Sequence, residues 1–208
     1  MIDFSQAPMK HGTDEQVKAL AGSALPDWMI RAAGVFDPFV DYGECPEGKI
    51  SYGVTSAGYD IRLKQGVKLF VDNRTCVIDP KAPVDDKELA FVPIDTPEVI
   101  IPPNSYILGV SVERFKVPRN WIGVCWGKST YARSGIIVNI TPQEPGWEGH
   151  LVVEVANGTR LPAKVYTGEG IAQVMFLELR AECQRSYPEK PNAKYQGQPG
   201  DRVTLAKV

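Results

Sequence analysis

The chain has 208 residues, of which 43% are hydrophobic and 23% are charged, and its formal net charge is −2. This length is enough for one domain with its own hydrophobic core. The nearly balanced charge gives no support to a nucleic-acid partner. There is no long apolar run, and no apolar stretch follows a basic N-terminus, so we expect no membrane association and no secretory signal, and predict a cytoplasmic protein.

The cysteines are too few and too widely spaced for a disulfide scaffold, and their spacing matches no zinc pattern. They are Cys45, Cys76, Cys125 and Cys183. We therefore expect free thiols in a reducing compartment.

Two short helices are predicted near the N-terminus. Thr13 followed by Gln16 is a capping-box signal ahead of an apolar stretch. The second helix would begin at Pro26 and end at Gly34, because proline is favoured at helix starts and glycine at helix ends. We treat residues 1–25 as an N-terminal extension.

From about Ile50 onward the chain is predicted to be mainly β. Its 17 prolines and 19 glycines fall at short intervals, which disfavours long helices and favours short strands joined by turns. Roughly ten strands at this spacing indicate a sandwich or barrel rather than alternating β and α units. The predicted strands are 59–63, 67–71, 76–80, 89–94, 99–103, 105–115, 121–126, 136–141, 150–157, 162–167 and 171–179.

The stretch GKSTYARSG, residues 127–135, contains a cluster typical of phosphate-binding loops. It lacks the preceding glycine-rich loop and the long helix of a P-loop, so it is not a Walker motif. Ser129 or Thr130 would instead cap a helix of one or two turns whose free N–H groups favour an anion, with Lys128 and Arg133 adding charge. A capped surface helix with solvated cations is the alternative interpretation.

A carboxylate interrupts the apolar strand predicted at 150–157. Because side chains alternate along a strand, Glu154 shares a face with Val152 and Ala156. A carboxylate among apolar neighbours is expected to be paired with a cation or to have a raised pKa, and a general base working near neutral pH needs a raised pKa. The alternative is a glutamate on an exposed strand face.

Several motifs together resemble one family. GKSTYARSGIIVNITPQEPGWEGHLVVEVAN followed by LPAKVYTGEGIAQVMFLE looks like the core of dCTP deaminase, in the trimeric dUTPase-like superfamily. The likeness continues through VTSAGYDIRL, IIPPNSY and SYPEKPNAKYQGQPG, so that it covers nearly everything from Trp28 to Val208. It is closest to the shorter bacterial form of the enzyme, and residues 1–25 are unmatched.

The resemblance implies a distorted jelly-roll or β-barrel that assembles as a homotrimer with active sites between subunits. Residues 26–180 would form the β domain. The polar tail 181–208, which lacks periodicity and otherwise suggests a solvated terminus, would be an arm that orders on ligand and closes over the triphosphate.

The resemblance also implies an activity, the conversion of dCTP and water to dUTP and ammonia, which supplies dUTP for thymidylate synthesis. Glu154 would be the catalytic base, and Ser129 and Arg133 would position the water and balance charge. The nucleotide-binding residues carried over are Lys128, Ser129, Thr130, Tyr131, Ala132, Arg133, Val152, Val153, Glu154, Gln173, Tyr187, Lys194 and Gln198. The family also suggests dTTP as a feedback inhibitor.

Zinc is not expected to activate the water. Most deaminases hold zinc in an H-x-E…P-C-x-x-C pattern, but this chain has only His11 and His150 and no C-x-x-C. Glu154, aided by Arg133 and backbone groups, would activate the water instead. Magnesium would arrive on the triphosphate, with most of its ligands from phosphate and water.

Two alternatives stay open. A bifunctional enzyme would continue to dUMP and pyrophosphate, but Glu144 stands where dUTPases usually have an aspartate, which weakens this case; Glu144 would otherwise be a turn residue at a trimer interface. A non-catalytic nucleotide-binding regulator would not need Glu154, Ser129 and Arg133 together.

Two further sets of residues are expected to be structural. Asp60 of AGYDIRL is predicted to form an ion pair, with Arg62 or with a neighbouring subunit. Tryptophans are more often core or interface anchors than base-stacking platforms, and the four are Trp28, Trp121, Trp126 and Trp147.

Overall fold

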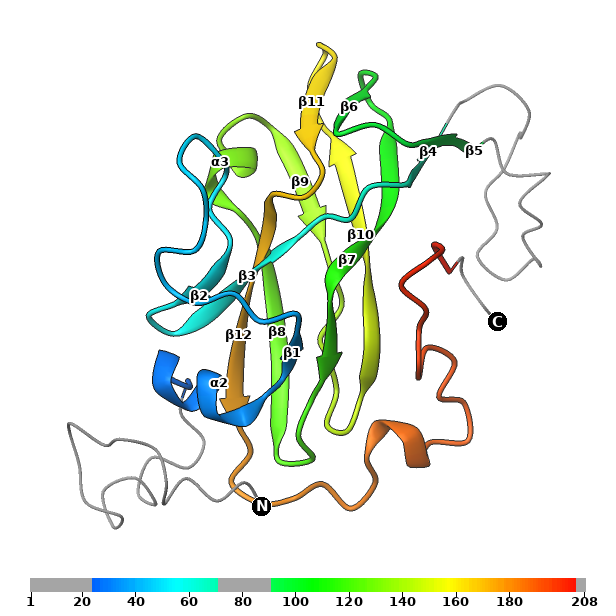
Figure 1. Cartoon of the computed structure of the whole chain (residues 1–208). Helices are drawn as coiled ribbons and strands as arrows, with labels where there is room; N and C mark the ends of the chain where they lie inside the picture. The colour runs from blue at the N-terminus through cyan, green and yellow to red at the C-terminus, as the bar shows by residue number, and fades with distance from the viewer. Residues whose placement is uncertain (1–23, 71–90, 205–208) are drawn as a thin grey trace.

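The computed structural model describes residues 24–70 and 91–204 (Figure 1). The helix predicted from Thr13 and Gln16 and the strand predicted at 76–80 lie outside these residues. So does nearly all of the N-terminal extension.

Helix α2 (Asp27–Ala33) confirms the second predicted helix. Pro26 occupies its N-cap, and Gly34 ends it in the left-handed conformation at φ 60°, which glycine adopts without steric cost. Met29 and Ile30 are buried in the core. In the part of the chain described, no helix has the length and apolar character needed to cross a membrane.

The rest of the described chain is mainly antiparallel β, as predicted. A six-stranded sheet has the order β5-β4-β7-β10-β9, with β1 also pairing with β7. Its strands are β1 (Phe36–Asp37), β4 (Val67–Phe70), β5 (Phe91–Ile94), β7 (Tyr106–Lys116), β9 (Ile136–Asn139) and β10 (Glu148–Asn157).

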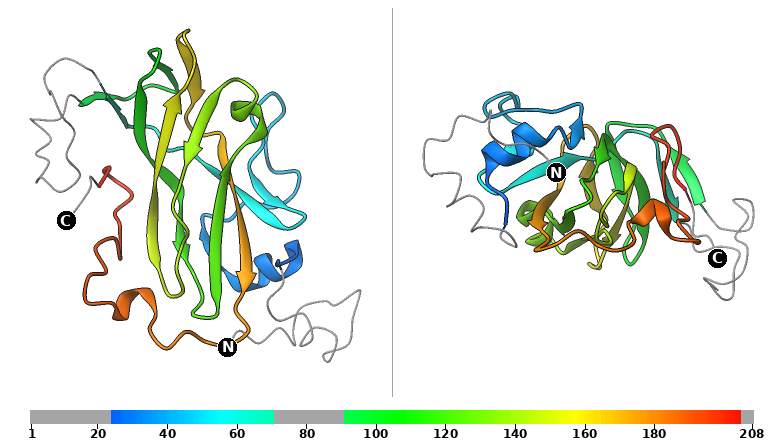
Figure 2. Two further views of the ribbon diagram at one scale, coloured as in Figure 1. Left: turned by 180° about the vertical axis from the view of Figure 1, so that it is seen from behind. Right: turned by 90° about the horizontal axis from the view of Figure 1, so that it is seen from below.

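A four-stranded sheet has the order β2-β3-β12-β8, and β11 and β6 form a separate pair. The strands are β2 (Gly53–Thr55), β3 (Gly58–Arg62), β6 (Glu98–Ile101), β8 (Trp121–Gly127), β11 (Ala163–Tyr166) and β12 (Gly170–Glu178). Figure 2 shows β7, β8, β10 and β12 running lengthwise through the molecule.

Aromatic rings join the two larger sheets in one core. Phe36 on β1 stacks on Tyr59 of β3 with ring centroids 4.0 Å apart, and it contacts Phe115 of β7 edge-on at 4.9 Å. The ring centroid of Phe176 on β12 lies 5.7 Å from that of Phe36. Because the cluster draws on both sheets, strands far apart in sequence are fixed relative to one another.

The C-terminal arm docks along the first half of β10. Gly197 N donates to Glu148 O at 2.8 Å, and His150 N donates to Gln198 O at 3.0 Å. Trp147 Nε1 donates to Tyr195 O at 2.8 Å. The backbone of the arm therefore hydrogen-bonds to its own chain, and closure of the arm over a triphosphate stays a prediction.

Candidate active site

The stretch that resembles a phosphate-binding loop, residues 127–135, contains a single helical turn, α3 (Ser129–Ala132), directly after β8. The N-cap is Lys128, whose carbonyl accepts the N–H groups of Tyr131 and Ala132 at 3.0 Å each, and there is no side-chain cap. The prediction that Ser129 or Thr130 caps this helix is wrong. The two hydroxyl side chains are exposed instead.

Tyr131 anchors α3 to the core. Its side chain is buried, and its hydroxyl accepts a hydrogen bond from Tyr166 N at 3.1 Å. Arg133 and Ala132 are exposed on the outer side of the turn. Because its side chain is buried, Tyr131 can offer a ligand only its backbone groups.

Lys128 lies between two oxygen partners. Its ammonium forms a short ion pair with the buried carboxylate of Asp60 and donates to Ser51 Oγ at 3.0 Å. Burial raises the pKa of Asp60, and the hydrogen bond and charge of Lys128 oppose this shift. The ion-pair role predicted for Asp60 is confirmed, but Arg62 is the wrong partner because it pairs with Glu113 at 2.7 Å.

Gln173 joins this group from the first half of β12. It stands opposite Asp60 on one side and Trp126 on the other, and directly opposed residues share a sheet face. Its amide donates to Thr55 Oγ1 at 3.2 Å. The structure thus brings Gln173, Lys128 and α3 to one end of the four-stranded sheet.

Three of the four tryptophans take the core role predicted for them. Trp121 and Trp147 are buried in the core, and Trp28 packs against it. Trp126 is 57% exposed, so it is not a core residue, and its role as an interface anchor stays a prediction.

Glu154 lies half-buried on β10, paired in register with Asn139 of β9 and Leu108 of β7. Burial raises the pKa of its carboxyl, opposed by a backbone hydrogen bond of Glu154 itself and a side-chain hydrogen bond from Asn139. Its Oε2 is buried without a hydrogen-bond partner. The predicted raised pKa is confirmed, and the role of base stays a prediction.

The two valines before Glu154 differ. Val152 shares the face of Glu154 and is half-buried, whereas the Val153 side chain is fully buried in the core on the opposite face. Only backbone groups of Val153 are available to a nucleotide.

Within one chain, α3 and the arm attach at opposite ends of β10. α3 leads through Gly135 into β9, whose first residue Ile136 pairs with Asn157. Gln198 of the arm instead bridges Gly149. Eight residues of strand separate the two attachments, about 26 Å at roughly 3.3 Å per residue, and Figures 1 and 2 show α3 and the arm on opposite sides of the molecule.

The remaining predicted residues belong to the arm. Tyr187 N donates to Pro145 O at 2.8 Å, and its hydroxyl accepts from Tyr195 N at 3.2 Å. Lys194 is exposed, while the buried Oε1 of Gln198 has no hydrogen-bond partner. The structure does not bring Lys194 or Gln198 to the α3 of the same chain.

Glu144 forms an ion pair with Lys190 of the arm. This contact lies within the chain, so the turn residue predicted at an interface has an internal partner.

Three residues of the site region were missed by the sequence interpretation: Asn139, Ser51 and Lys190. Asn139 is the one with a usable signal, since it is the polar residue of the apolar run IIVNI. Its pairing with Glu154 depends on strand register, which the run itself does not specify.

Comparison with solved structures defines the fold class. The crystal structure of 2'-deoxycytidine 5'-triphosphate deaminase from Agrobacterium tumefaciens matches with a TM-score of 0.55 at 20% identity, covering 74% of this chain and 47% of that chain. At this identity the match shows the fold, and the chain spans about half of that structure. The dUTPase-like β fold expected from the resemblance is confirmed.

Sequence comparison then identifies the family. The model of the dCTP deaminase-like family matches residues 47–179. A dCTP deaminase of Azotobacter vinelandii is 48% identical over 183 residues, 86% of this chain and 94% of that protein. One of Wolbachia pipientis wMel is 44% identical over 189 residues, 89% of this chain and 100% of that protein. The chain belongs to the dCTP deaminase-like family.

Proposed function

We propose that this protein catalyses the hydrolytic deamination of dCTP to dUTP and ammonia, which supplies dUTP for thymidylate synthesis. The observation that carries the proposal is Glu154, a carboxyl with a raised pKa and one buried, unpartnered oxygen. Relatives named dCTP deaminase match almost their whole length to this chain, so the domain needed for their activity is present.

In the proposed mechanism Glu154 takes a proton from water as the oxygen attacks C4 of cytosine. The same carboxyl delivers this proton to N3, which leaves a tetrahedral C4 that carries a hydroxyl and the amine. It then takes the second proton from that hydroxyl and passes it to the amine, so that the C4–N bond breaks, the C4 carbonyl forms, and one ammonia leaves for each water consumed. Asn139 holds one carboxylate oxygen through its hydrogen bond. Ser129 and Arg133 would position the water and balance the developing charge.

The active site is proposed to lie between subunits of a homotrimer. If Gln198 and α3 contact the same triphosphate, they must come from different copies, because their attachments to β10 are about 26 Å apart in one chain. Exposed apolar side chains support assembly: Trp126 is 57% exposed and Ile137, opposite Ala156 on the face of Glu154, is 61% exposed.

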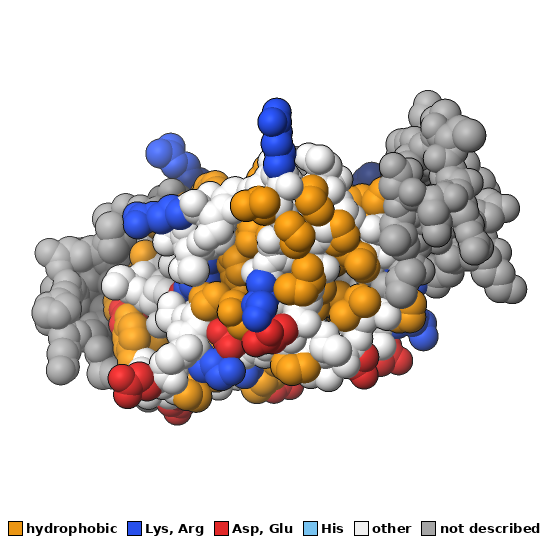
Figure 3. Space-filling view, turned by 90° about the horizontal axis from the view of Figure 1, so that it is seen from above, with side chains coloured by type: hydrophobic (Ala, Val, Ile, Leu, Met, Phe, Trp, Pro, Cys, Tyr) orange, Lys and Arg blue, Asp and Glu red, His pale blue; other side chains and the backbone are white. Residues whose placement is uncertain are grey.

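A second apolar region lies at the end of the molecule near β6 and β11. Figure 3 shows hydrophobic side chains gathered over this end around a few charged groups. Ile100 and Leu161 are 50% and 72% exposed there, and Lys164 pairs with Glu98 at 2.6 Å. This surface is a second candidate for subunit contact.

We propose that magnesium enters with the nucleotide and that no zinc takes part. Within residues 24–70 and 91–204 there is no group of three or more His, Cys, Asp or Glu side chains placed to hold a metal ion. This fits a cation bound mainly by triphosphate and water, the arrangement that magnesium favours.

A cytoplasmic location and feedback inhibition by dTTP complete the proposal. Cys45, Cys125 and Cys183 are free thiols, which fits a reducing compartment. Inhibition by dTTP would be measured as loss of dCTP turnover at increasing dTTP.

The full chain incubated with dCTP and magnesium, without zinc, tests the function. We expect equal amounts of ammonia and dUTP, and inhibition by a chelator that magnesium reverses. Release of dUMP and pyrophosphate would instead favour the bifunctional enzyme, with Glu144 freed from Lys190. Tight dCTP binding without turnover would favour a regulator, and rescue by zinc but not magnesium would contradict the mechanism.

Removal of residues 194–208 is expected to weaken dCTP binding by at least about tenfold, since hydrogen bonds to charged groups contribute about 1.5–3 kcal/mol each. Binding of deoxycytidine should change little. The variants Lys194→Ala and Gln198→Ala are the finer test, because they leave the docking of the arm backbone intact. Unchanged triphosphate affinity in all three proteins would return the arm to a structural role.

A further inference from the structure

Residues 49–51, here called the 49–51 segment, are clamped to the turn before β12. Glu169 in that turn is buried and accepts Ile50 N at 2.8 Å and Lys49 Nζ at 2.8 Å. Ile50 O accepts Gly170 N at 3.1 Å in return. The clamp therefore has one ion pair at Lys49 and two hydrogen bonds at Ile50, one to the Glu169 carboxylate and one between backbone groups. Ser51 follows directly in the chain.

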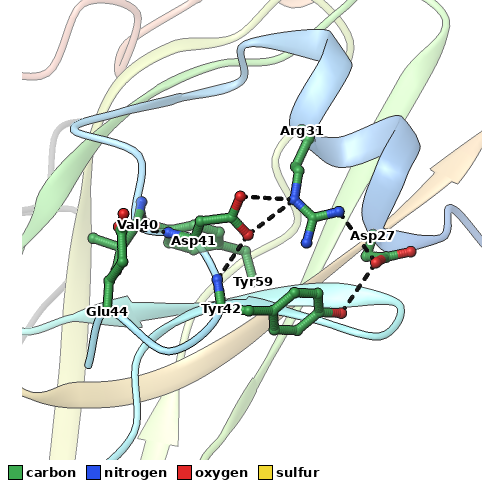
Figure 4. Close-up of polar contacts among 7 residues, drawn as sticks. All are labelled: Asp27, Arg31, Val40, Asp41, Tyr42, Glu44 and Tyr59. Carbon is green, nitrogen blue, oxygen red and sulfur yellow. Dashed lines mark hydrogen bonds and ion pairs between the residues drawn. The ribbon is translucent and has the colours of Figure 1, made fainter. Parts of the chain in front are cut away.

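The loop that leads into this segment is also fixed at its start. Figure 4 shows Arg31 of α2 between two carboxylates: its Nε lies 2.9 and 3.0 Å from the oxygens of Asp41, and its Nη1 lies 3.3 Å from Asp27. Tyr42 donates its hydroxyl to Asp27 at 3.2 Å and places its ring under the guanidinium, 4.7 Å from the ring centroid. The loop is thus held to α2 at one end and to Glu169 at the other.

Lys128 passes directly over this clamp. A Cβ added to Gly170 would meet Ser51 O at 2.0 Å and Lys128 Cδ at 3.0 Å, so the lysine stem and the 49–51 segment lie packed on the glycine. Beyond this contact, the ammonium meets Ser51 Oγ at 3.0 Å and pairs with Asp60. Figure 1 shows the loop between β1 and β2 rising beside α3.

We propose that Ser51, set in place by Glu169, is a positioning residue that orients the Lys128 ammonium for the substrate's triphosphate. This inference rests on the proposed function, in which Lys128 binds that group. A lysine side chain has four rotatable bonds, so a fixed hydroxyl acceptor beside Asp60 reduces the ordering that nucleotide binding would otherwise require. We therefore expect Ser51 to increase affinity only for ligands that carry the phosphate chain.

Ser51→Ala tests the inference directly, because the side chain is exposed and its removal is not expected to disturb folding. The KM for dCTP should rise about fivefold, the effect of one ordinary hydrogen bond, with kcat nearly unchanged. Binding of deoxycytidine should stay the same. Ser51→Thr keeps the hydroxyl and should retain wild-type KM.

Coupling to Lys128 separates positioning from general stabilisation. In a Lys128→Met background, Ser51→Ala should cause no further rise in KM or in the dissociation constant for dCTP. Glu169→Gln keeps an acceptor for Ile50 N but loses the charge that holds Lys49. Like Ser51→Ala, it should raise the KM for dCTP. Thr96→Ala is the matched control, since it removes an exposed hydroxyl that donates to Glu98 O at 2.6 Å and not to Lys128.

Wild-type turnover of dCTP with an unchanged KM in Ser51→Ala would overturn this inference and leave the proposed function standing. An equal rise in KM with and without Lys128 would also overturn it, because the effect would not pass through the lysine. A wild-type protein that neither binds nor deaminates dCTP would overturn both.

Discussion

Glu154→Gln is expected to lower kcat for dCTP deamination by about 10²–10⁴-fold, the usual contribution of a positioned general base. Glutamine has nearly the same shape and can keep the hydrogen bond with Asn139, but it cannot accept a proton from water. The dissociation constant for dCTP should change much less than kcat, since no phosphate contact is lost. Single-turnover measurements with purified protein separate the two quantities.

Glu148→Gln is the matched control for this change. Glu148 lies on the same strand and the same face, but it is partly exposed and pairs with Arg114 at 2.7 Å. It should deaminate dCTP at the wild-type rate. Substantial turnover by Glu154→Gln, or equal loss in both variants, would refute the assignment of the base.

Burial of Glu154 also predicts an effect on stability. A carboxyl whose folded-state pKa is raised favours folding below its unfolded pKa, and this contribution is lost as the pH rises through the folded pKa. Glu154→Gln should therefore melt higher than wild type at pH 8, with a smaller difference near pH 5. A lower melting temperature at pH 8 would mean that the carboxylate is well paired.

The features that the sequence predicted depend on local patterns. Alternation along 150–157 correctly separates Val153 from Glu154, because the period of two is a property of the strand itself. Proline at 26 and glycine at 34 likewise bound α2, because their effect on the backbone needs no distant partner.

The partners of charged residues could not be obtained in this way. Asp60 and Arg62 lie two residues apart on β3, yet Asp60 pairs with Lys128, 68 residues away, and Arg62 with Glu113, 51 residues away. Both partners are brought in by strand register and sheet crossing. A pairing between neighbours in sequence was therefore the wrong expectation.

The arm shows a second limit of side-chain patterns. β9 pairs only with Glu154 to Asn157 of β10, so the first half of that strand has an open edge. The arm occupies this edge through backbone groups, including the bridge between Gln198 and Gly149. A polar, aperiodic segment can be ordered by such pairing, because backbone hydrogen bonds leave no periodicity in the sequence.

Arg62→Met is expected to lower the free energy of unfolding by about 3–5 kcal/mol at pH 8, because it leaves a buried carboxylate without its cation. Glu113 is fully buried and accepts Arg62 Nε at 2.7 Å and Arg62 N at 2.9 Å. The guanidinium also lies 4.8 Å from the centroid of the Tyr52 ring. Denaturant unfolding at a fixed protein concentration measures the change.

The loss in Arg62→Met should depend on pH. Burial already raises the pKa of Glu113, against the opposing hydrogen bonds and charge of Arg62. Without the arginine the folded-state pKa rises further, so the carboxyl takes up a proton and the destabilisation shrinks as the pH falls toward the ordinary carboxyl pKa of about 4.3. A loss that is equal at pH 5 and pH 8 would contradict a charged Glu113.

Arg114→Met provides the comparison that isolates burial. Arg114 lies next to Glu113 on β7, and its pair with Glu148 is partly exposed on both sides, so its loss should cost no more than about 1 kcal/mol. The double variant Arg62→Met/Glu113→Leu should recover most of the stability lost in Arg62→Met, since it leaves no buried charge unpaired. Recovery would show that the Arg62–Glu113 pair joins β3 to β7 at a net desolvation cost. The same pair holds β3, the strand from which Asp60 reaches Lys128.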